Sequence, residues 1–221
     1  MQDDTGIPRR VLLQGAAVLG VSALAGSALA APRDRAFAQG DAESASAYNG
    51  AQYGFLVRTA NCVNCQECVE ACRRANATPD GVQARREVTP YKTASSQTVY
   101  VSTGCMHCEE PACATVCPAH AITKGEGGVV SVDHDRCIGC KYCFQACPYE
   151  VPKYNSVSMD KCDCCQKAGV KIGEEDPYCV RACKFGALKF GPLDELLEAT
   201  NGSAVPIAEP NDPSCLVLGM E

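Results

Sequence analysis

The sequence predicts an α+β fold in which short strands and short helices are joined by long connecting loops. Eighteen of its 221 residues are cysteine, whereas it has no tryptophan, 5 phenylalanines and 8 tyrosines. All the cysteines except Cys215 fall in four closely spaced groups, and short alternating or apolar segments separate the groups. So few large apolar side chains make a small core, and small cores of this kind draw part of their stability from metal–ligand bonds.

The third cysteine group carries the most specific signal in the chain. It reads Cys137-x2-Cys140-x2-Cys143-x3-Cys147, and Pro148 follows it directly. This is the spacing of bacterial ferredoxins, in which three cysteines hold one iron–sulfur cluster and the fourth binds a neighbouring cluster. The proline ends the last turn because it cannot donate the next backbone hydrogen bond. The group therefore predicts a cluster-binding loop.

The first two groups repeat this design with small changes. The first has the spacing of the third, and the second has a wider gap in its middle; their members are Cys62, Cys65, Cys68 and Cys72, and Cys105, Cys108, Cys113 and Cys117. Asn64 stands in the first group where Gly139 stands in the third. Both residues tolerate the left-handed backbone that such a loop requires before its second cysteine.

The fourth group is less regular and comprises Cys162, Cys164, Cys165, Cys179 and Cys183. Spacing favours Cys162 and Cys165 as ligands, so we treat Cys164 and Cys215 as spare thiols. An apolar pair follows the closing cysteine of the second and fourth groups at the same offset, which argues that each half of the chain ends its cluster loop with a strand. The sequence thus predicts two bacterial-ferredoxin-like units, together spanning residues 53–200.

The segments between the groups predict the other elements. In chain order these are a strand at 53–59, a helical segment ending at 77, a turn at 79–81, a polar connection at 82–96, a strand at 98–102, a hairpin over 121–132, a surface loop at 166–178, a capped helix at 192–199 and a tail at 201–221. The tail is rich in proline, and we expect it to lie over the surface or over a partner.

Residues 1–38 predict an export signal, and residues 39–52 a polar linker. Arg9 and Arg10 precede two leucines and a run of Ala, Gly, Leu and Val, and small residues suited to cleavage follow. Paired arginines in this position resemble the twin-arginine signal. That route carries folded proteins, so clusters could be inserted in the cytoplasm before export. The alternative is a permanent membrane anchor, although alanine- and glycine-rich runs insert poorly.

Two other uses of clustered cysteines are disfavoured by the spacing. Zinc sites take four ligands as two pairs and need no run of four closed by a proline. Cysteines two residues apart in a turn are badly placed to form a disulfide with each other. The formal charge of −6 also gives no basic face for nucleic acid.

Four cysteine groups in this order resemble the iron–sulfur electron-transfer subunits of the DMSO reductase family of molybdopterin enzymes. The similarity runs from Tyr53 to about Leu197. The motifs that carry it include Cys105-x2-Cys108-Glu109-x-Pro111-Ala112-Cys113, Ala146-Cys147-Pro148-Tyr149 and Lys161-Cys162-Asp163.

The resemblance implies four [4Fe–4S] clusters, because in that family the first group pairs with the fourth and the second with the third. Carried over to this chain, the four ligand sets are Cys62, Cys65, Cys68 and Cys183; Cys162, Cys165, Cys179 and Cys72; Cys105, Cys108, Cys113 and Cys147; and Cys137, Cys140, Cys143 and Cys117. Some relatives have tryptophan in place of Cys108 and hold a three-iron cluster, so cysteine there implies four-iron clusters throughout.

The resemblance further implies a non-catalytic subunit on the outer face of the cytoplasmic membrane. It would relay electrons between an integral-membrane, quinol-interacting subunit and a molybdopterin catalytic subunit. The alternatives are a stand-alone exported ferredoxin-like carrier and a zinc-binding structural protein. An intrinsic enzyme is a more distant reading, since the radical-SAM cysteine motif is absent. The terminal substrate and the direction of electron flow do not follow from the sequence.

The remaining polar residues near the cysteines are assigned supporting roles. The histidines are expected to form hydrogen bonds or to be exposed, rather than to catalyse; they are His107, His120 and His134. Nearby positive charges are expected to help set cluster potentials; examples are Lys141, Arg181 and Lys184.

Overall fold

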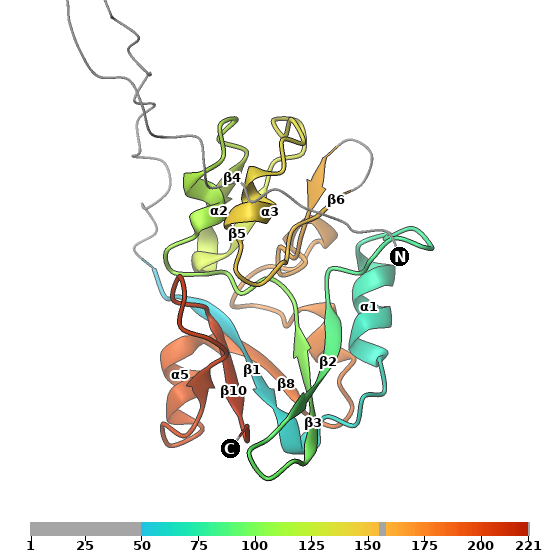
Figure 1. Cartoon of the computed structure of the whole chain (residues 1–221), viewed down its shortest axis with the longest axis vertical. Coiled ribbons are helices and arrows are strands. Elements are labelled where there is room, and N and C mark those ends of the chain that lie inside the picture. Colours follow the sequence, from blue (N-terminus) through green and yellow to red (C-terminus); the bar gives the residue numbers. More distant parts are fainter. Residues whose placement is uncertain (1–49, 155–157, 221) are drawn as a thin grey trace, which may run out of the picture. The chain divides into compact units, whose positions relative to one another are not determined.

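A small mixed sheet and several two-stranded hairpins carry the cysteine loops (Figure 1). The computed structural model describes residues 50–154 and 158–220, and all of these belong to one compact unit. The predicted signal at 1–38 and the linker as far as residue 49 lie outside the described residues. The longest described helix has 9 residues, so the predicted mixture of short helices, short strands and long loops is confirmed. Within the described ranges, no helix is both long and apolar enough to cross a bilayer.

Strand β1 (Tyr53–Arg58) is the centre of the larger sheet and confirms the strand predicted there. It runs antiparallel to β8 (Leu188–Pro192) and parallel to β10 (Cys215–Leu218), and β9 (Val205–Pro206) borders β10. Side chains alternate across a strand, so Phe55 packs with the cysteine-rich core while Leu56 faces the helix on the other side. Glycine is required at position 54, because a Cβ there would collide with the carbonyl oxygen of Ser214.

The tail beyond residue 200 is part of this sheet, so the expectation that it lies over the surface is wrong. β10 lies between β1 and β9, and Leu216 and Val217 are buried. Ser214 donates its hydroxyl to the carbonyl oxygen of His107 at 2.9 Å. Gln52, at the end of the predicted linker, donates to both of these residues, at 3.0 Å to the His107 carbonyl and 2.8 Å to the Ser214 hydroxyl. The tail thereby fixes the second cysteine loop.

A hairpin of β2 (Glu87–Lys92) and β3 (Thr98–Thr103) stands beside this sheet. The strand predicted at 98–102 is confirmed, but the connection predicted at 82–96 is wrong where β2 forms. β2 is largely exposed and contains Pro90, so it lacks the apolar alternation that signals a strand. Residues 87–92 form a strand because they pair with β3.

The second hairpin confirms the prediction for residues 121–132. It pairs β4 (Ile122–Lys124) with β5 (Val130–Val132) around the 3₁₀ turn η3 (Glu126–Gly128). Two short helices, α2 (Ala112–Thr115) and α3 (Tyr142–Ala146), pack against each other beside it. A minimal hairpin of β6 (Lys153–Tyr154) and β7 (Met159–Asp160) completes this part. Its core joins apolar side chains to cysteines of the second and third groups.

Helix α1 (Glu67–Ala75) packs against α4 (Tyr178–Arg181) much as α2 packs against α3. The turn η2 (Thr59–Asn61) leads into the first cysteine group, and η4 (Gln166–Ala168) follows the paired cysteines of the fourth. The surface loop predicted between Gln166 and Tyr178 is only partly exposed, because Val170 and Ile172 are buried. Ile172 belongs to the main core. Its neighbours in the sequence are mostly lysine, glycine and glutamate, so the sequence did not indicate that it is buried.

Helix α5 (Leu193–Glu198) confirms the helix predicted after Gly191. Its N-cap is Pro192, and no side chain caps it, so the expected capping interaction is wrong. Leu196 on this helix packs with Leu56 and Leu216 in a separate apolar cluster. Sheet and helix thus anchor β1 from the side opposite the cysteines.

Replacing Leu216 with alanine tests whether the tail is structural. Truncation of a buried leucine costs about 2–5 kcal/mol, so we expect a clearly lower thermal unfolding temperature for anaerobically purified protein. The matched control is Val205→Ala, because Val205 is 53% exposed in the neighbouring strand and its truncation should change little. Equal behaviour of the two variants would show that the tail does not stabilise the fold.

Candidate metal centres

The four cysteine loops share one backbone feature that places their thiols. The residue before the second cysteine of each loop has a left-handed conformation; these residues are Asn64 (φ 56°), His107 (φ 45°), Gly139 (φ 67°) and Cys164 (φ 52°). The expected left-handed backbone at Asn64 and Gly139 is therefore confirmed. The same turn at Cys164 makes Cys165 the counterpart of Cys65 and Cys140.

The first set of thiols surrounds a small cavity of about 20 Å³ beside α1. It comprises Cys62, Cys65, Cys68 and Cys183, here called the Cys62 quartet. Burial raises the pKa of Cys62, and the negative charges of the other three thiolates raise it further. The hydroxyl of Ser102 lies 3.3 Å from Sγ of Cys68. Four thiols that repel one another as thiolates form a strong donor set for a cationic metal centre.

A matching small cavity of about 10 Å³ lies between α3 and the β4–β5 hairpin. Its thiols belong to Cys117, Cys137, Cys140 and Cys143, the Cys117 quartet. Burial raises the pKa of Cys143. The Tyr154 hydroxyl, whose oxygen lies 2.9 Å from Sγ of Cys143, forms a hydrogen bond that lowers this pKa. Backbone amides of Ala121 and Met159 donate to the sulfurs of Cys117 and Cys137 at 3.3 and 3.4 Å. Such N–H···S bonds are typical of cluster loops.

The Cys105 quartet consists of Cys105, Cys108, Cys113 and Cys147. Burial raises the pKa of Cys108 to about 12, and the other three thiolates contribute in the same direction. Lys161 donates from Nζ to Sγ of Cys105 at 3.4 Å and to the carbonyl oxygen of Cys162 at 3.1 Å. This buried ammonium therefore connects the second loop to the fourth.

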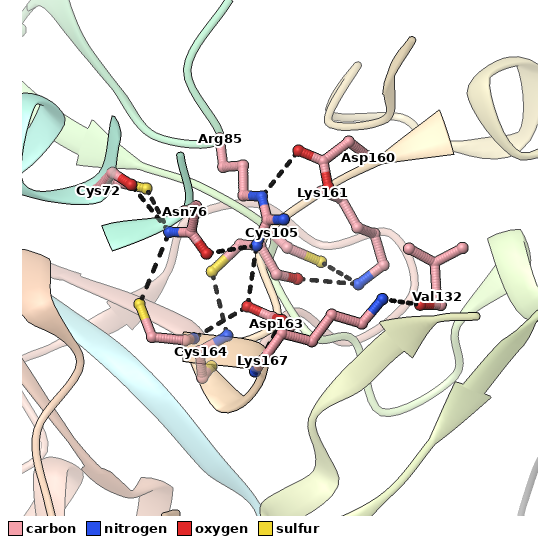
Figure 2. A network of polar contacts seen from close by, with 12 residues as sticks. Cys72, Asn76, Arg85, Cys105, Val132, Asp160, Lys161, Asp163, Cys164 and Lys167 are labelled. Atoms are coloured by element: carbon pink, nitrogen blue, oxygen red, sulfur yellow. Dashed lines mark hydrogen bonds and ion pairs between the residues drawn. The ribbon is translucent and has the colours of Figure 1, made fainter. Parts of the chain in front are cut away.

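The Cys72 quartet consists of Cys72, Cys162, Cys165 and Cys179. Burial raises the pKa of Cys72 to about 12, and the charges of the other three thiolates add to the rise. The amide of Asn76 reaches Sγ of Cys72 at 3.7 Å (Figure 2). It also reaches Sγ of Cys165 at 3.9 Å. The two sulfurs therefore share one donor although their loops are far apart in sequence.

A polar network holds the fourth loop in this position (Figure 2). The guanidinium of Arg85 donates to Asp160 at 2.8 Å and to Asp163 at 3.1 Å. It also donates to the side-chain oxygen of Asn76 at 2.6 Å, which turns the Asn76 amide group toward the sulfurs. Asp163 in turn accepts from the backbone N–H of Cys165 at 3.0 Å.

Two of the predicted sets each line a common cavity, and in the other two the thiolates act electrostatically on one another. All eighteen cysteines lie in the described part of the chain, and none is paired in a disulfide. The quartets also have an order, because electrostatic interactions connect Cys68 to Cys179 and Cys113 to Cys143, and Lys161 connects the middle two. The Cys62 quartet comes first in this order, and the Cys72, Cys105 and Cys117 quartets follow it in turn. Iron ligation by each residue stays a prediction.

Two buried cations lie among the thiols, and sequence reasoning did not assign them this role. Arg86 is 2% exposed and donates to the Ser102 carbonyl and hydroxyl at 3.0 and 3.2 Å. Burial opposes its charge, but the thiolates of Cys179 and Cys162 more than compensate and raise its pKa. Lys161, also 2% exposed, is held charged in the same way. Arg86 follows another arginine in a polar stretch, where nothing signals burial.

The charges and histidines that were predicted to support the clusters divide into two classes. His107 is buried among the loops, as expected for a hydrogen-bonding residue. The others are exposed or partly exposed at the surface; they are His120, His134, Lys141, Arg181 and Lys184. The buried positive charges beside the thiols therefore belong to Arg86 and Lys161, whereas the lysines and the arginine predicted for this role lie at the surface.

The comparisons with known proteins agree with this donor set. A family model described as a 4Fe-4S dicluster domain matches residues 96–193. The B subunit of anaerobic dimethyl sulfoxide reductase from Escherichia coli K12 is 41% identical over 159 residues, covering 66% of this chain and 76% of the relative. The thiosulfate reductase electron transfer subunit PhsB of Salmonella typhi is 40% identical over 150 residues, covering 65% and 78%. Protein NrfC of E. coli K12 is 37% identical over 153 residues, covering 66% and 68%.

These matches make [4Fe–4S] clusters the cofactor of the chain, and the structure fits that cofactor. Each quartet offers four sulfur donors. Two of them enclose a cavity, and backbone N–H groups, a tyrosine hydroxyl and buried cations face the sulfurs. A zinc-binding structural protein would explain neither the matches nor these surroundings.

Serine substitutions of distant cysteines test the quartets. Cys62 and Cys183 share a quartet, so Cys62→Ser and Cys183→Ser should each remove or convert the same paramagnetic centre. The iron content should fall from about 16 toward about 12 per chain if one four-iron centre is lost. The matched control is Cys147→Ser, which should affect a different centre. Electron paramagnetic resonance of the reduced proteins would contradict the sets if Cys183→Ser and Cys147→Ser changed the same signal.

Proposed function

Since the chain belongs to the family of iron–sulfur electron-transfer subunits of the DMSO reductase type, we propose that it carries single electrons through four [4Fe–4S] clusters within a reductase complex. Each bound cluster supplies a carrier of one electron, and the chain supplies thiols, a dry interior and fixed charges. The sixteen ligands are those of the four quartets. We propose that the Cys62 and Cys72 quartets form one ferredoxin-like unit and the Cys105 and Cys117 quartets form another, both within residues 53–200.

The observation that carries this proposal is the unbroken order of the quartets. The Cys72 and Cys105 quartets lie in the middle, and none of their cysteines is exposed. Buried Arg86 and Lys161 lie among them and offset the negative charge that reduction adds. This arrangement of buried donors and fixed charges supports a role in conducting electrons.

The two outer quartets each present one exposed cysteine, which supports their role as the points of electron entry and exit. Cys65 is exposed in the Cys62 quartet, near Val63 (56% exposed) and Phe185 (51% exposed). Cys140 is exposed in the Cys117 quartet, near Ile138 (68% exposed) and Tyr142 (59% exposed). Exposed apolar side chains of this kind mark protein interaction sites.

We assign the two partners from the relatives that the chain matches. One relative is named as a chain of anaerobic dimethyl sulfoxide reductase, and another as the electron transfer subunit of thiosulfate reductase. Both names describe parts of multi-subunit reductases. We therefore propose a molybdopterin catalytic subunit at one end and an integral-membrane, quinol-interacting subunit at the other. With residues 1–38 as a twin-arginine signal, the complex would face the outer side of the cytoplasmic membrane, and the chain would be held there by its partner.

Purification of the whole complex separates this function from that of a stand-alone exported carrier. The tagged chain, isolated anaerobically from membranes, should bring with it a large subunit that contains molybdenum and a membrane subunit. Val63→Asp should release one of these partners and Ile138→Asp the other. The matched control is Val205→Asp, at an exposed apolar residue (53% exposed) that does not line either cavity. Recovery of the fully loaded chain alone, without molybdenum, would contradict the proposal.

A further inference from the structure

Cys164 carries the one thiol in the four described cysteine loops that the quartets do not use. It is fully buried, with 0% exposure. Its backbone is left-handed at the turn before Cys165. Its Sγ lies 3.3 Å from Nε2 of His107.

The backbone around His107 determines which of its nitrogens carries the proton. The N–H of Val130 donates to Nδ1 at 3.0 Å, so Nδ1 is an acceptor and the neutral ring bears its hydrogen on Nε2. A doubly protonated ring would turn its Nδ1–H toward the N–H of Val130. The packing therefore accommodates the neutral ring, whose Nε2–H donates to Cys164.

Because Sγ of Cys164 accepts this hydrogen bond, its own S–H is free to donate to another group. Cys162 is a candidate acceptor, since Nε2 of His107 and the sulfurs of Cys162 and Cys164 all lie within 4.8 Å of one another. The backbone N–H of Cys164 also donates to the Cys162 sulfur, at 3.4 Å.

We propose that Cys164 is neither a ligand nor an idle thiol, but a hydrogen-bond donor that raises the reduction potential of the cluster held by the Cys72 quartet. The inference rests on the proposed function, because it takes Cys162 as a cluster ligand. Reduction adds negative charge to the cluster and its sulfurs, and a donor aimed at a ligand sulfur stabilises that charge. The chain of donors runs from Val130 in β5 through His107 and Cys164 to Cys162.

This arrangement explains why Cys164 needs to be buried and why its neighbour is a histidine. In water the S–H would exchange partners freely and the effect would be screened, whereas in a dry interior a hydrogen bond to a charged sulfur is strong. His107 lies between Cys105 and Cys108 in the second loop, so it holds the fourth loop against the second. Cys164 is thus a positioning and tuning residue at the junction of the two middle quartets.

The test compares Cys164→Ala and Cys164→Ser with Cys215→Ala in the full chain. Cys215 is the matched control because it is also buried (3% exposed) and lies outside every quartet. The readouts are iron per chain and the midpoint potential of each centre in an anaerobic titration followed by paramagnetic resonance. A hydrogen bond to a charged sulfur is strong enough to shift an equilibrium about tenfold.

We expect Cys164→Ala to keep its full iron content and to make one centre about tenfold harder to reduce, which is 59 mV for one electron. Cys164→Ser retains a donor and should restore part of the shift, and Cys215→Ala should leave all potentials unchanged. Loss of a four-iron centre in both Cys164 variants would make Cys164 a ligand, and unchanged potentials would make it idle; either result overturns the proposal. Failure of the proposed function looks different, because the unsubstituted, fully loaded chain would then purify without a molybdenum-containing partner.

Discussion

The burial of thiols beside one another is the constraint on which the rest of this structure depends. Burial and neighbouring sulfurs raise the pKa of Cys72 and of Cys108 to about 12. Thiols in such surroundings carry charge only when a metal centre or a fixed cation compensates it. The iron of the clusters supplies most of that compensation, and Arg86 and Lys161 supply the rest from inside the protein. Removing the metal leaves a core with few large apolar side chains to hold it together.

The fold is arranged to bring distant segments to the same sulfurs. Asn76 after α1 bonds to sulfurs of the first and fourth loops, and Lys161 joins the fourth loop to the second. β10, which comes last in the chain, pairs with β1, which comes first among the described strands. These contacts fix loops that have little regular structure of their own. Spacing between the quartets, and with it the path of the electron, is therefore a property of the whole fold.

The cysteine spacing made the loops predictable because it reflects the local geometry of a cluster. Asn64 and Gly139 could be assigned left-handed backbone for the same reason, since the turn needs it whatever surrounds it. The strands at 53–59 and 98–102 and the hairpin over 121–132 followed from apolar alternation. The assignment of cysteines to quartets came from family resemblance, because the exchange of the fourth cysteine between loops leaves no mark in local sequence.

The features that were missed depend on contacts between distant residues. β2 is a strand only because β3 pairs with it, and β10 is too short and too close to prolines to stand out. Arg86 looks like a surface residue until Ser102, Phe55 and the thiols enclose it. Cys164 looked idle because spacing says which thiols can be ligands, and says nothing of what the other thiols contact. For Arg86, Cys164 and β10 the partner lies many residues away, whereas β2 pairs with the strand that follows it.

Iron and acid-labile sulfide in the anaerobically purified full-length chain test the central claim most directly. Four [4Fe–4S] clusters predict about 16 iron atoms and about 16 sulfide ions per chain, with the absorption and low-potential paramagnetic signals of reduced clusters. A colourless protein that contains zinc, or that contains no metal and has its cysteines in disulfides, would contradict the account.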